Sequence, residues 1–252
     1  MPIWPRAGGD KSGDKNVTKR QPPILELGNG RSVSLQPGME ITIARPMADI
    51  CIVFDTTASM SGKIEGLINC MVDFAADLAR LSLDWRLSVV PFGDLTVPGD
   101  RIDAGLPFTA SVAGAVSQLR TMPRFAGGGN NGESSIEALL SAIAKPWRAK
   151  AVRVILLLTD EPALGPDRAG EVLRGLHAAE VICFTASPDH PYFRSWAAKT
   201  GGRWANISKT MDTSAVLNLL RGLVGDVAKA ASDMHAIAGS SYRKYLEITA
   251  GK

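Results

Sequence analysis

The sequence predicts an α/β protein built on a mostly parallel, doubly wound (Rossmann-like) sheet with helices on both faces. Short apolar strands alternate with segments of helical periodicity from about residue 47 to residue 230. These strands are hydrophobic throughout instead of alternating with polar residues, as a parallel sheet covered on both faces requires. Of the 252 residues, 45% are hydrophobic and 21% are charged, which is typical of a globular protein with a sizeable core.

The chain before this core is predicted to form a tail and a small antiparallel β appendage. Residues 1–22 are rich in Gly, Pro, Lys and Asp and have no apolar periodicity, which indicates a flexible tail. Residues 23–46 alternate apolar and polar side chains around the turn signals Gly-Asn-Gly and Gln-Pro-Gly, which predicts two or three short strands. In the C-terminal extension, residues 231–252, the run KYLEITA alternates in the same way and favours a place in the same small sheet.

The core elements follow from the period and length of the apolar pattern. Residues 49–55 form the first predicted strand, and apolar side chains at helical spacing then predict a helix over residues 61–81. Continuous apolar runs predict further strands at residues 85–92, 152–160 and 180–186, and amphipathic spacing predicts helices at residues 112–120, 133–144, 167–178 and 213–231. The core domain therefore spans residues 47–230. Ligands of such a sheet bind beyond the carboxyl ends of its strands.

Oxygen-bearing side chains gather in the sequence at two of these strand ends. Asp55 and Asp160 each end an apolar strand, and Thr57 and Ser59 follow Asp55 at alternate positions, each with a hydroxyl group. Hard oxygen donors without His or Cys are the ligands that Mg²⁺ prefers. The alternative is structural, with Thr57 or Ser59 capping the next helix and Asp55 holding a turn.

At these positions the chain resembles the von Willebrand factor type A (vWA) family. The segment Asp55-Thr56-Thr57-Ala58-Ser59 is similar to the Asp-x-Ser-x-Ser sequence of the family's metal-ion-dependent adhesion site, with Thr in place of the first Ser. Asp160 in LLLTDEP matches a later aspartate of the family. The loop AGGGNNGESSIEAL resembles the Gly-rich loop of many intracellular members, and the TGG run at residues 200–202 resembles the segment before their last strand. The resemblance covers about residues 48–228 and implies the doubly wound fold.

The resemblance also implies a ligand set. Thr57 and Ser59 would coordinate Mg²⁺, or Mn²⁺ or Ca²⁺ in its place, and Asp55 and Asp160 would act directly or through water. The Gly-rich loop lacks the Thr of adhesive members, and Asn130 stands where related loops often carry Asp, so its carbonyl oxygen is the expected ligand from that loop. The neighbouring residues expected around the rim are Ser61, Asn131, Glu133 and Asp94.

The function implied by the resemblance is binding and not catalysis. One coordination position of the ion would stay open for an Asp or Glu of a partner protein. Stand-alone intracellular members are similar to parts of assemblies that contain AAA+ ATPases, kinases, phosphatases or proteases, so a partner of that kind is expected. Two alternatives remain: a metal-free scaffolding domain with a degenerate site, and a Mg²⁺-dependent hydrolase, which would need a base or nucleophile beside the ion.

Other classes of function find little support in the sequence, and no catalytic residue is predicted. The 28 Lys and Arg against 25 Asp and Glu give a net charge of +3, without the basic excess of a nucleic-acid-binding protein. The three Cys and three His show no zinc-ligand spacing. Ser61-Gly62-Lys63 resembles the end of a phosphate-binding loop, but Thr57 stands where that loop requires Gly.

The expected compartment is the cytoplasm, with no membrane partner. The N-terminal residues lack the apolar stretch of a secretory signal, and the longest strongly apolar run is far shorter than the ~20 residues that cross a bilayer. An odd number of scattered cysteines also favours a reducing environment.

Overall fold

The structure, a computed structural model, describes residues 24–27, 31–34, 47–80, 83–129 and 132–207, with single residues between 218 and 247. The chain divides into two compact units, residues 1–44 and residues 45–252. In the first unit, β1 (Ile24–Leu27) and β2 (Arg31–Ser34) pair antiparallel, with Ile24 opposite Ser34. The predicted small β appendage is thus confirmed. The predicted tail and any third strand before residue 47 lie outside the described residues.

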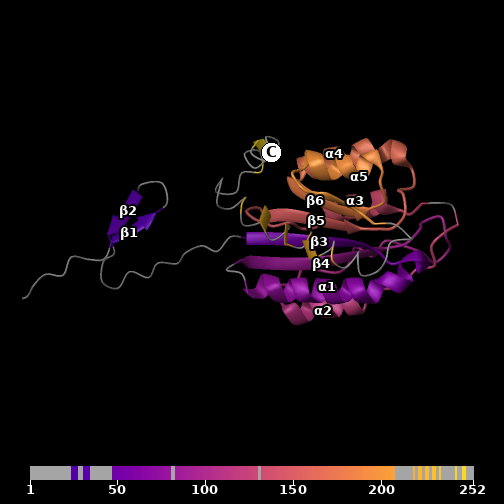
Figure 1. Ribbon diagram of the computed structural model, residues 1–252, viewed down its shortest axis with the longest axis horizontal. Helices are drawn as coiled ribbons and strands as arrows, with labels where there is room; N and C mark the ends of the chain where they lie inside the picture. Colours follow the sequence, from indigo (N-terminus) through magenta and orange to yellow (C-terminus); the bar gives the residue numbers. More distant parts are fainter. Residues whose placement is uncertain are drawn as a thin grey trace, which may run out of the picture. The chain divides into compact units, whose positions relative to one another are not determined.

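The second unit contains a five-stranded sheet in which every strand is parallel to its neighbours (Figure 1). Its order is β4-β3-β5-β6-β7. The strands are β3 (Met47–Asp55), β4 (Asp84–Phe92), β5 (Val152–Leu158), β6 (Val181–Ser187) and β7 (Trp204–Asn206). The predicted α/β class and the parallel sheet are therefore confirmed.

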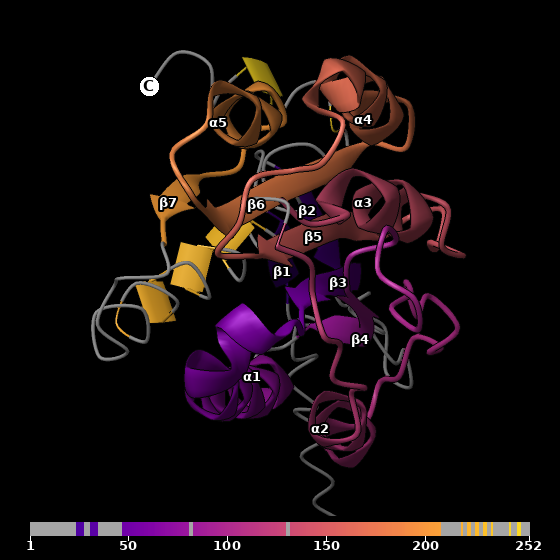
Figure 2. The ribbon, with the colours of Figure 1, turned by 90° about the vertical axis from the view of Figure 1, so that its right-hand side faces the viewer.

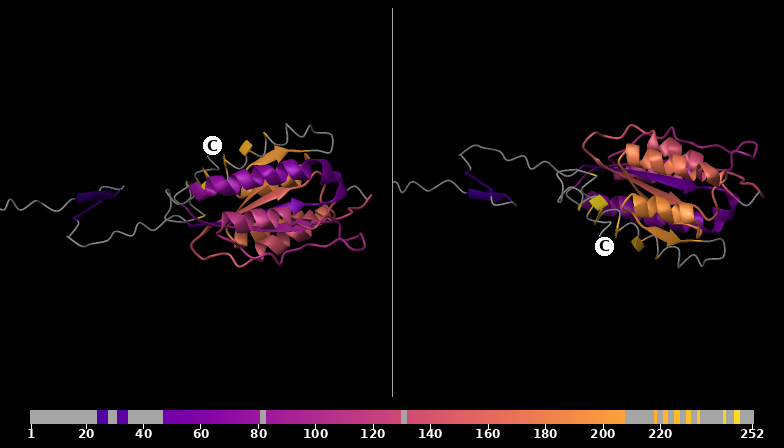
Figure 3. Two further views of the ribbon diagram at one scale, coloured as in Figure 1. Left: turned by 90° about the horizontal axis from the view of Figure 1, so that it is seen from below. Right: turned by 90° about the horizontal axis from the view of Figure 1, so that it is seen from above.

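Helices cover both faces of this sheet, as Figures 2 and 3 show from three directions. One face carries α1 (Ser61–Arg80) and α2 (Val112–Arg120), and the other carries α3 (Ser135–Ile143), α4 (Ala169–Ala178) and α5 (Pro191–Lys199). Short 3₁₀ helices, η1 (Ala58–Met60) and η2 (Pro166–Arg168), precede α1 and α4. Helix α5 adds to the predicted elements. Pro191 occupies its first turn, where the missing N–H of proline costs no hydrogen bond.

The two faces explain why the strands are hydrophobic throughout. In β3, the side chains of Ile50, Ile52 and Phe54 pack into the cluster beneath α1 and α2. The alternate residues Cys51 and Val53 pack into the second cluster, beneath α3, α4 and α5. Successive side chains of a strand point to opposite faces, so a strand between two helical layers buries every residue.

The C-terminal segment differs from the strand that its alternating pattern predicts. Its described residues Tyr242, Leu246 and Glu247 are helical, and in the described part of the chain the small sheet holds only β1 and β2. Tyr242 is buried, and its hydroxyl donates a hydrogen bond to the carbonyl oxygen of Val181, 3.3 Å away. Tyr242 and Leu246 contact the same core cluster because residues four apart share one helical face. The described residues of the helix predicted at 213–231 are also helical.

The strand order places two strand ends at a topological switch point. From β3 the chain passes to β4 on one side, then returns to β5 on the other side of β3. In open α/β sheets the crevice outside such a point is where ligands bind. Asp55 is the last residue of β3, and Asp160 follows the end of β5 by two residues. Among the described residues, no helix is both long and apolar enough to span a bilayer.

Candidate functional site

Four oxygen atoms form a continuous chain of contacts at this switch point. The hydroxyl of Thr57 donates to Oδ1 of Asp55 at 2.6 Å and lies 3.2 Å from the hydroxyl oxygen of Ser59. The hydroxyl of Ser59 in turn donates to Oδ1 of Asp160 at 2.8 Å. The structure therefore brings together four of the five predicted metal ligands, although Asp55 and Asp160 are far apart in the sequence.

Two further side chains hold the carboxylates in place. Thr159 donates its hydroxyl proton to Oδ2 of Asp55 at 2.7 Å, which links the end of β5 to the end of β3. Lys63, in the first turn of α1, donates from Nζ to Oδ2 of Asp160 at 2.7 Å. The Lys63 side chain is only 8% exposed and that of Asp160 is fully buried, so this ion pair is largely shielded from solvent.

The spacing of the four oxygens fits adjacent ligands of a small divalent cation. Oxygens at ~2.1 Å from Mg²⁺ in an octahedron stand ~3.0 Å from their neighbours. The three separations here are 2.6, 3.2 and 2.8 Å. Asp55 and Thr57 are buried, whereas Ser59 and the neighbouring Ala58 and Ser61 are exposed. The donor set is thus buried on the protein side and open on one side, where a further ligand could enter.

Burial strongly affects the carboxyl group of Asp55. The side chain is fully buried, and this loss of solvation is the main reason that the pKa of Asp55 rises to about 6. Hydrogen bonds from Thr57 and Thr159 oppose the rise, and the nearby charge of Asp160 adds to it. A carboxylate held ionised against its own burial gains from a nearby cation, as perturbed groups in functional sites do.

Glu133 adds a third buried acid, next to Thr57. It is 2% exposed, and its Oε2 has no hydrogen-bond partner. Burial, together with the charges of Asp55, Asp94 and Asp100, raises the pKa of Glu133 to about 8. Its backbone N–H donates to the carbonyl of Pro162 at 2.9 Å, which ties the Gly-rich loop to the loop after β5.

Gly127 lets that loop approach the site closely. Its φ of +72° lies in the left-handed region, and a Cβ atom there would lie 2.9 Å from Cβ of Thr57 and 3.0 Å from Oε1 of Glu133. A larger residue would therefore push Thr57 or Glu133 out of place. Asp100 fixes the loop, since its carboxylate accepts hydrogen bonds from the backbone N–H groups of Ala126 and Gly127, both at 2.9 Å.

The other predicted rim residues have different positions. Asp94 is buried and forms a turn, because its Oδ1 accepts hydrogen bonds from the N–H and the hydroxyl of Thr96 at 2.8 and 2.7 Å. Ser61 is exposed at the start of α1 and lines a cavity beside the site. Asn130 and Asn131 lie outside the described residues, so the ligand predicted from the Gly-rich loop stays a prediction.

Three contributors were not predicted: Lys63, Thr159 and Asp100. Lys63 carried a signal, since a cation in the first turn of a helix is unfavourable to the helix dipole and needs a carboxylate nearby. Thr159 and Asp100 gave no such signal, because their partners depend on how the loops fold together.

No three carboxyl, imidazole or thiol groups converge in the described chain as they do in an acidic or zinc-type metal centre. The candidate set is of another kind, two carboxylates and two hydroxyls. No family model matches the sequence, and comparison with curated proteins found no match either.

The protonation of Glu133 leads to a prediction for the metal-free protein. Its pKa in the folded protein, about 8, lies above the ordinary value of 4.5. Between these values the folded state holds a proton that the unfolded chain has released, so the free energy of unfolding should fall as pH rises. Urea denaturation in EDTA at pH 6, 7 and 8 should show this decline, and Glu133→Gln should reduce its slope.

The exposed carboxylate of Glu65, whose side chain is 72% exposed, supplies the control. Glu65→Gln should leave the pH dependence of the free energy of unfolding unchanged. If Glu133→Gln and the original protein lost stability equally between pH 6 and pH 8, Glu133 would be ionised throughout this range, which would contradict its raised pKa.

Proposed function

We propose that the protein is a metal-ion-dependent protein-binding module of the vWA type, which holds Mg²⁺ and captures a carboxylate of a partner protein. The main support is the chain of four oxygens from Asp55 to Asp160, spaced as neighbouring ligands of a small cation and open at Ser59. The resemblance of the sequence to the vWA family supports the same function. We place it in the cytoplasm, where buried thiols such as Cys51 and Cys183 stay reduced.

Each residue of the site would have a distinct part in this function. The hydroxyl oxygens of Thr57 and Ser59 would bind the ion, and Asp55 and Asp160 would balance its charge directly or through water. Thr159 and Lys63 hold the two carboxylates in position. When bound, Mg²⁺ supplies a hard, positively charged position that an Asp or Glu can fill.

A hydrolytic function has weaker support, so we propose that the protein is not an enzyme. Among the groups that the structure describes, burial raises the pKa of two acids here: Asp55, assigned above to the ion, and Glu133, the remaining candidate for a general base. At 2% exposure its carboxyl is shielded from solvent, where a general base must reach a substrate or its attacking water.

Calorimetry and capture experiments test the proposal together. Protein stripped with EDTA should bind one Mg²⁺ at submillimolar to millimolar concentration, and a binding partner captured in Mg²⁺ should be released by EDTA. Free acetate at high concentration should compete with the partner, because it offers the same carboxylate. Absence of any heat of binding up to 10 mM Mg²⁺, Mn²⁺ or Ca²⁺ would contradict the metal-dependent function.

A metal-free scaffolding domain is the second candidate, and the Lys63–Asp160 ion pair favours it. The ammonium group of Lys63 already offers Asp160 a positive charge at 2.7 Å. A site balanced in this way needs no ion to be stable. In the metal-dependent function, Mg²⁺ would instead share Asp160 with Lys63, and the repulsion between two nearby cations would weaken ion binding.

Lys63→Met separates these two candidates. The variant leaves Asp160 buried without its cation, so the midpoint of thermal unfolding in EDTA should fall. If the site binds metal, 5 mM Mg²⁺ should restore the midpoint, and the affinity for Mg²⁺ should rise about tenfold, since the competing charge is gone.

Arg80→Met is the matched control on the same helix. Arg80 pairs with Asp77 at 2.7 Å, but both side chains are exposed, so neither stability nor Mg²⁺ binding should change. A lower midpoint for Lys63→Met that no divalent ion restores would favour the scaffolding domain.

A further inference from the structure

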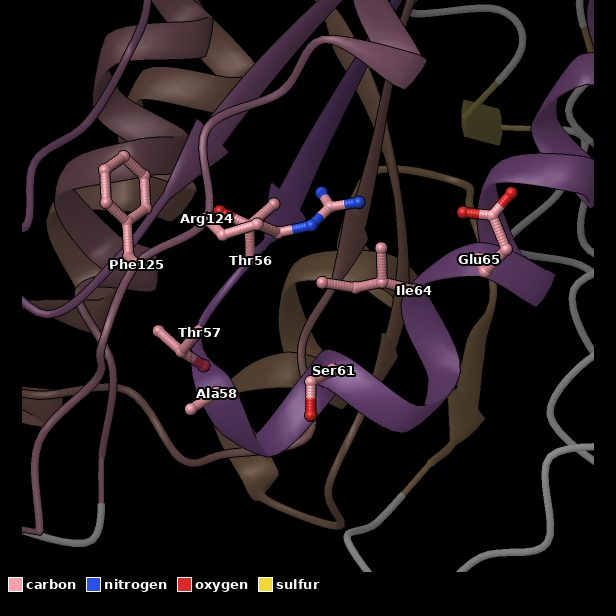
Figure 4. Close-up of a pocket in the computed structure, with 8 residues that line it drawn as sticks. All are labelled: Thr56, Thr57, Ala58, Ser61, Ile64, Glu65, Arg124 and Phe125. Atoms are coloured by element: carbon pink, nitrogen blue, oxygen red, sulfur yellow. The ribbon is translucent and has the colours of Figure 1, made fainter.

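A cavity of about 360 Å³ lies directly beside the candidate metal site (Figure 4). Thr57 belongs to both, and the cavity is bounded by the start of α1 and by the segment before the Gly-rich loop. The lining residues are Thr56, Thr57, Ala58, Ser61, Ile64, Glu65, Arg124 and Phe125. Backbone hydrogen bonds fix its wall, because the N–H of Phe125 donates to the carbonyl of Thr56 at 3.0 Å.

The cavity combines apolar walls with a positive charge. Ile64 and Phe125 are buried and supply apolar surface. Figure 4 shows the Arg124 side chain reaching from its own segment toward helix α1. Arg124 is exposed, and no carboxylate within the described ranges forms an ion pair with it.

A second guanidinium lies close by. Arg101 stacks over the ring of Phe125, with its central carbon 5.4 Å from the ring centroid, and it too lacks a carboxylate partner among the described residues. The nearest opposite charge lining the cavity, Glu65, faces Arg120 at 3.9 Å. Arg124 and Arg101 are therefore the cationic groups on this side of the metal site with which a negatively charged ligand could pair.

We propose that this cavity receives a second acidic side chain of the partner segment whose first carboxylate binds the metal ion. The proposal rests on the proposed function and deepens it: the partner offers an acidic peptide segment with two carboxylates close together. The first completes the coordination of Mg²⁺, and the second pairs with Arg124. Arg101, stacked on the ring of Phe125, adds a second positive charge next to that lining residue.

The lining favours a peptide carboxylate over a phosphate group. The methylene groups of Asp or Glu can pack against Ile64 and Phe125, whereas a phosphate has no apolar part to bury there. Glu65 at the rim would repel the second negative charge of a phosphate. A guanidinium that gains a carboxylate in a partly dry cavity contributes about a five- to tenfold increase in affinity.

Matched peptides of defined sequence test the inference on the whole 252-residue chain. The probes are acetylated and amidated peptides with one glutamate among glycines, and three others in which a second glutamate follows after zero, one or two glycines. Affinity is measured by nuclear magnetic resonance titration of the ¹⁵N-labelled protein in Mg²⁺ and in EDTA. In Mg²⁺, the best of the two-glutamate peptides should bind about five- to tenfold more tightly than the one-glutamate peptide.

Two arginine variants identify the cavity as the source of that difference. Arg124→Gln should abolish the advantage of the second glutamate and leave the affinity for the one-glutamate peptide unchanged. Arg120→Gln, an exposed neighbour that already faces Glu65, should keep the advantage. The backbone amide signals of Ile64 and Phe125 should shift only with the two-glutamate peptides.

The outcomes separate this inference from the proposed function. Equal Mg²⁺-dependent affinity for all peptides would overturn the second carboxylate site and leave the metal-dependent function standing. An advantage that depends on Arg124 and persists in EDTA would support the cavity and contradict the role of the metal. No shift with any peptide at 10 mM in either buffer would overturn both.

Discussion

Replacing Asp49 with alanine is expected to lower the free energy of unfolding by about 3–5 kcal/mol. Asp49 is fully buried at the start of β3, at the opposite end of the strand from Asp55. Its two oxygens accept hydrogen bonds from Nε and Nη2 of Arg86 at 2.9 and 2.6 Å, and from Nε and the backbone N–H of Arg148, both at 2.8 Å. The variant leaves two largely shielded guanidiniums without this shared carboxylate.

Urea denaturation followed by circular dichroism measures this loss, and Asp77→Ala is the control. Asp77 pairs with Arg80, and both side chains are exposed to solvent. Removal of the Asp77 carboxylate should therefore change the free energy of unfolding by less than about 0.5 kcal/mol. At temperatures where Asp49→Ala stays folded, its response to Mg²⁺ should match that of the original protein, because the network lies at the far end of the sheet. A loss below about 1 kcal/mol would contradict the structural role given to Asp49.

The strands of the core were predictable because each one is a continuous run of apolar residues within a short segment of the sequence. Residues such as Ile52 and Val53 are both apolar, and a strand covered by helices on both faces is the simplest way to bury two successive side chains. The order of the strands was not predictable from such runs. The strand order depends on where the chain goes after β4, and the sequence of one segment does not determine that path. The site lies at the switch point because of this order.

In the site, too, some residues could be predicted from the sequence, whereas others depend on how the chain folds. Asp55, Thr57 and Ser59 lie within five residues, and Asp160 stands out because an aspartate at the end of an apolar run is unusual, so all four could be identified from the sequence. The contacts of Lys63 with Asp160 and of Thr159 with Asp55 join residues about a hundred positions apart. Arg124 likewise gave no signal, since its importance comes from the cavity that the folded loops create.

Asp55→Asn is expected to abolish the stabilisation of the protein by Mg²⁺ without destabilising the metal-free form. In the original protein, Mg²⁺ at a hundred times its dissociation constant should add about 2.7 kcal/mol to the free energy of unfolding. Asparagine removes one of the two negative charges that balance the ion, so this gain should disappear. The amide oxygen can still accept the two hydrogen bonds from Thr57, and Thr159 can turn its hydroxyl proton toward the carbonyl of Glu161, 3.4 Å away.

Whether Asp55→Asn raises or lowers the stability of the protein in EDTA distinguishes a binding residue from a structural one. Burial raises the pKa of Asp55 to about 6, above its ordinary value of 3.8, so above pH 6 the folded protein carries the full cost of an ionised buried carboxylate. Asparagine removes that cost, and the midpoint of thermal unfolding in EDTA at pH 7.5 should stay equal or rise. Asp94→Asn, which changes a buried turn-forming aspartate near the same edge, should keep the response to Mg²⁺. A large loss of stability for Asp55→Asn in EDTA, together with no response of the original protein to Mg²⁺, would mean that Asp55 serves the fold and not a ligand.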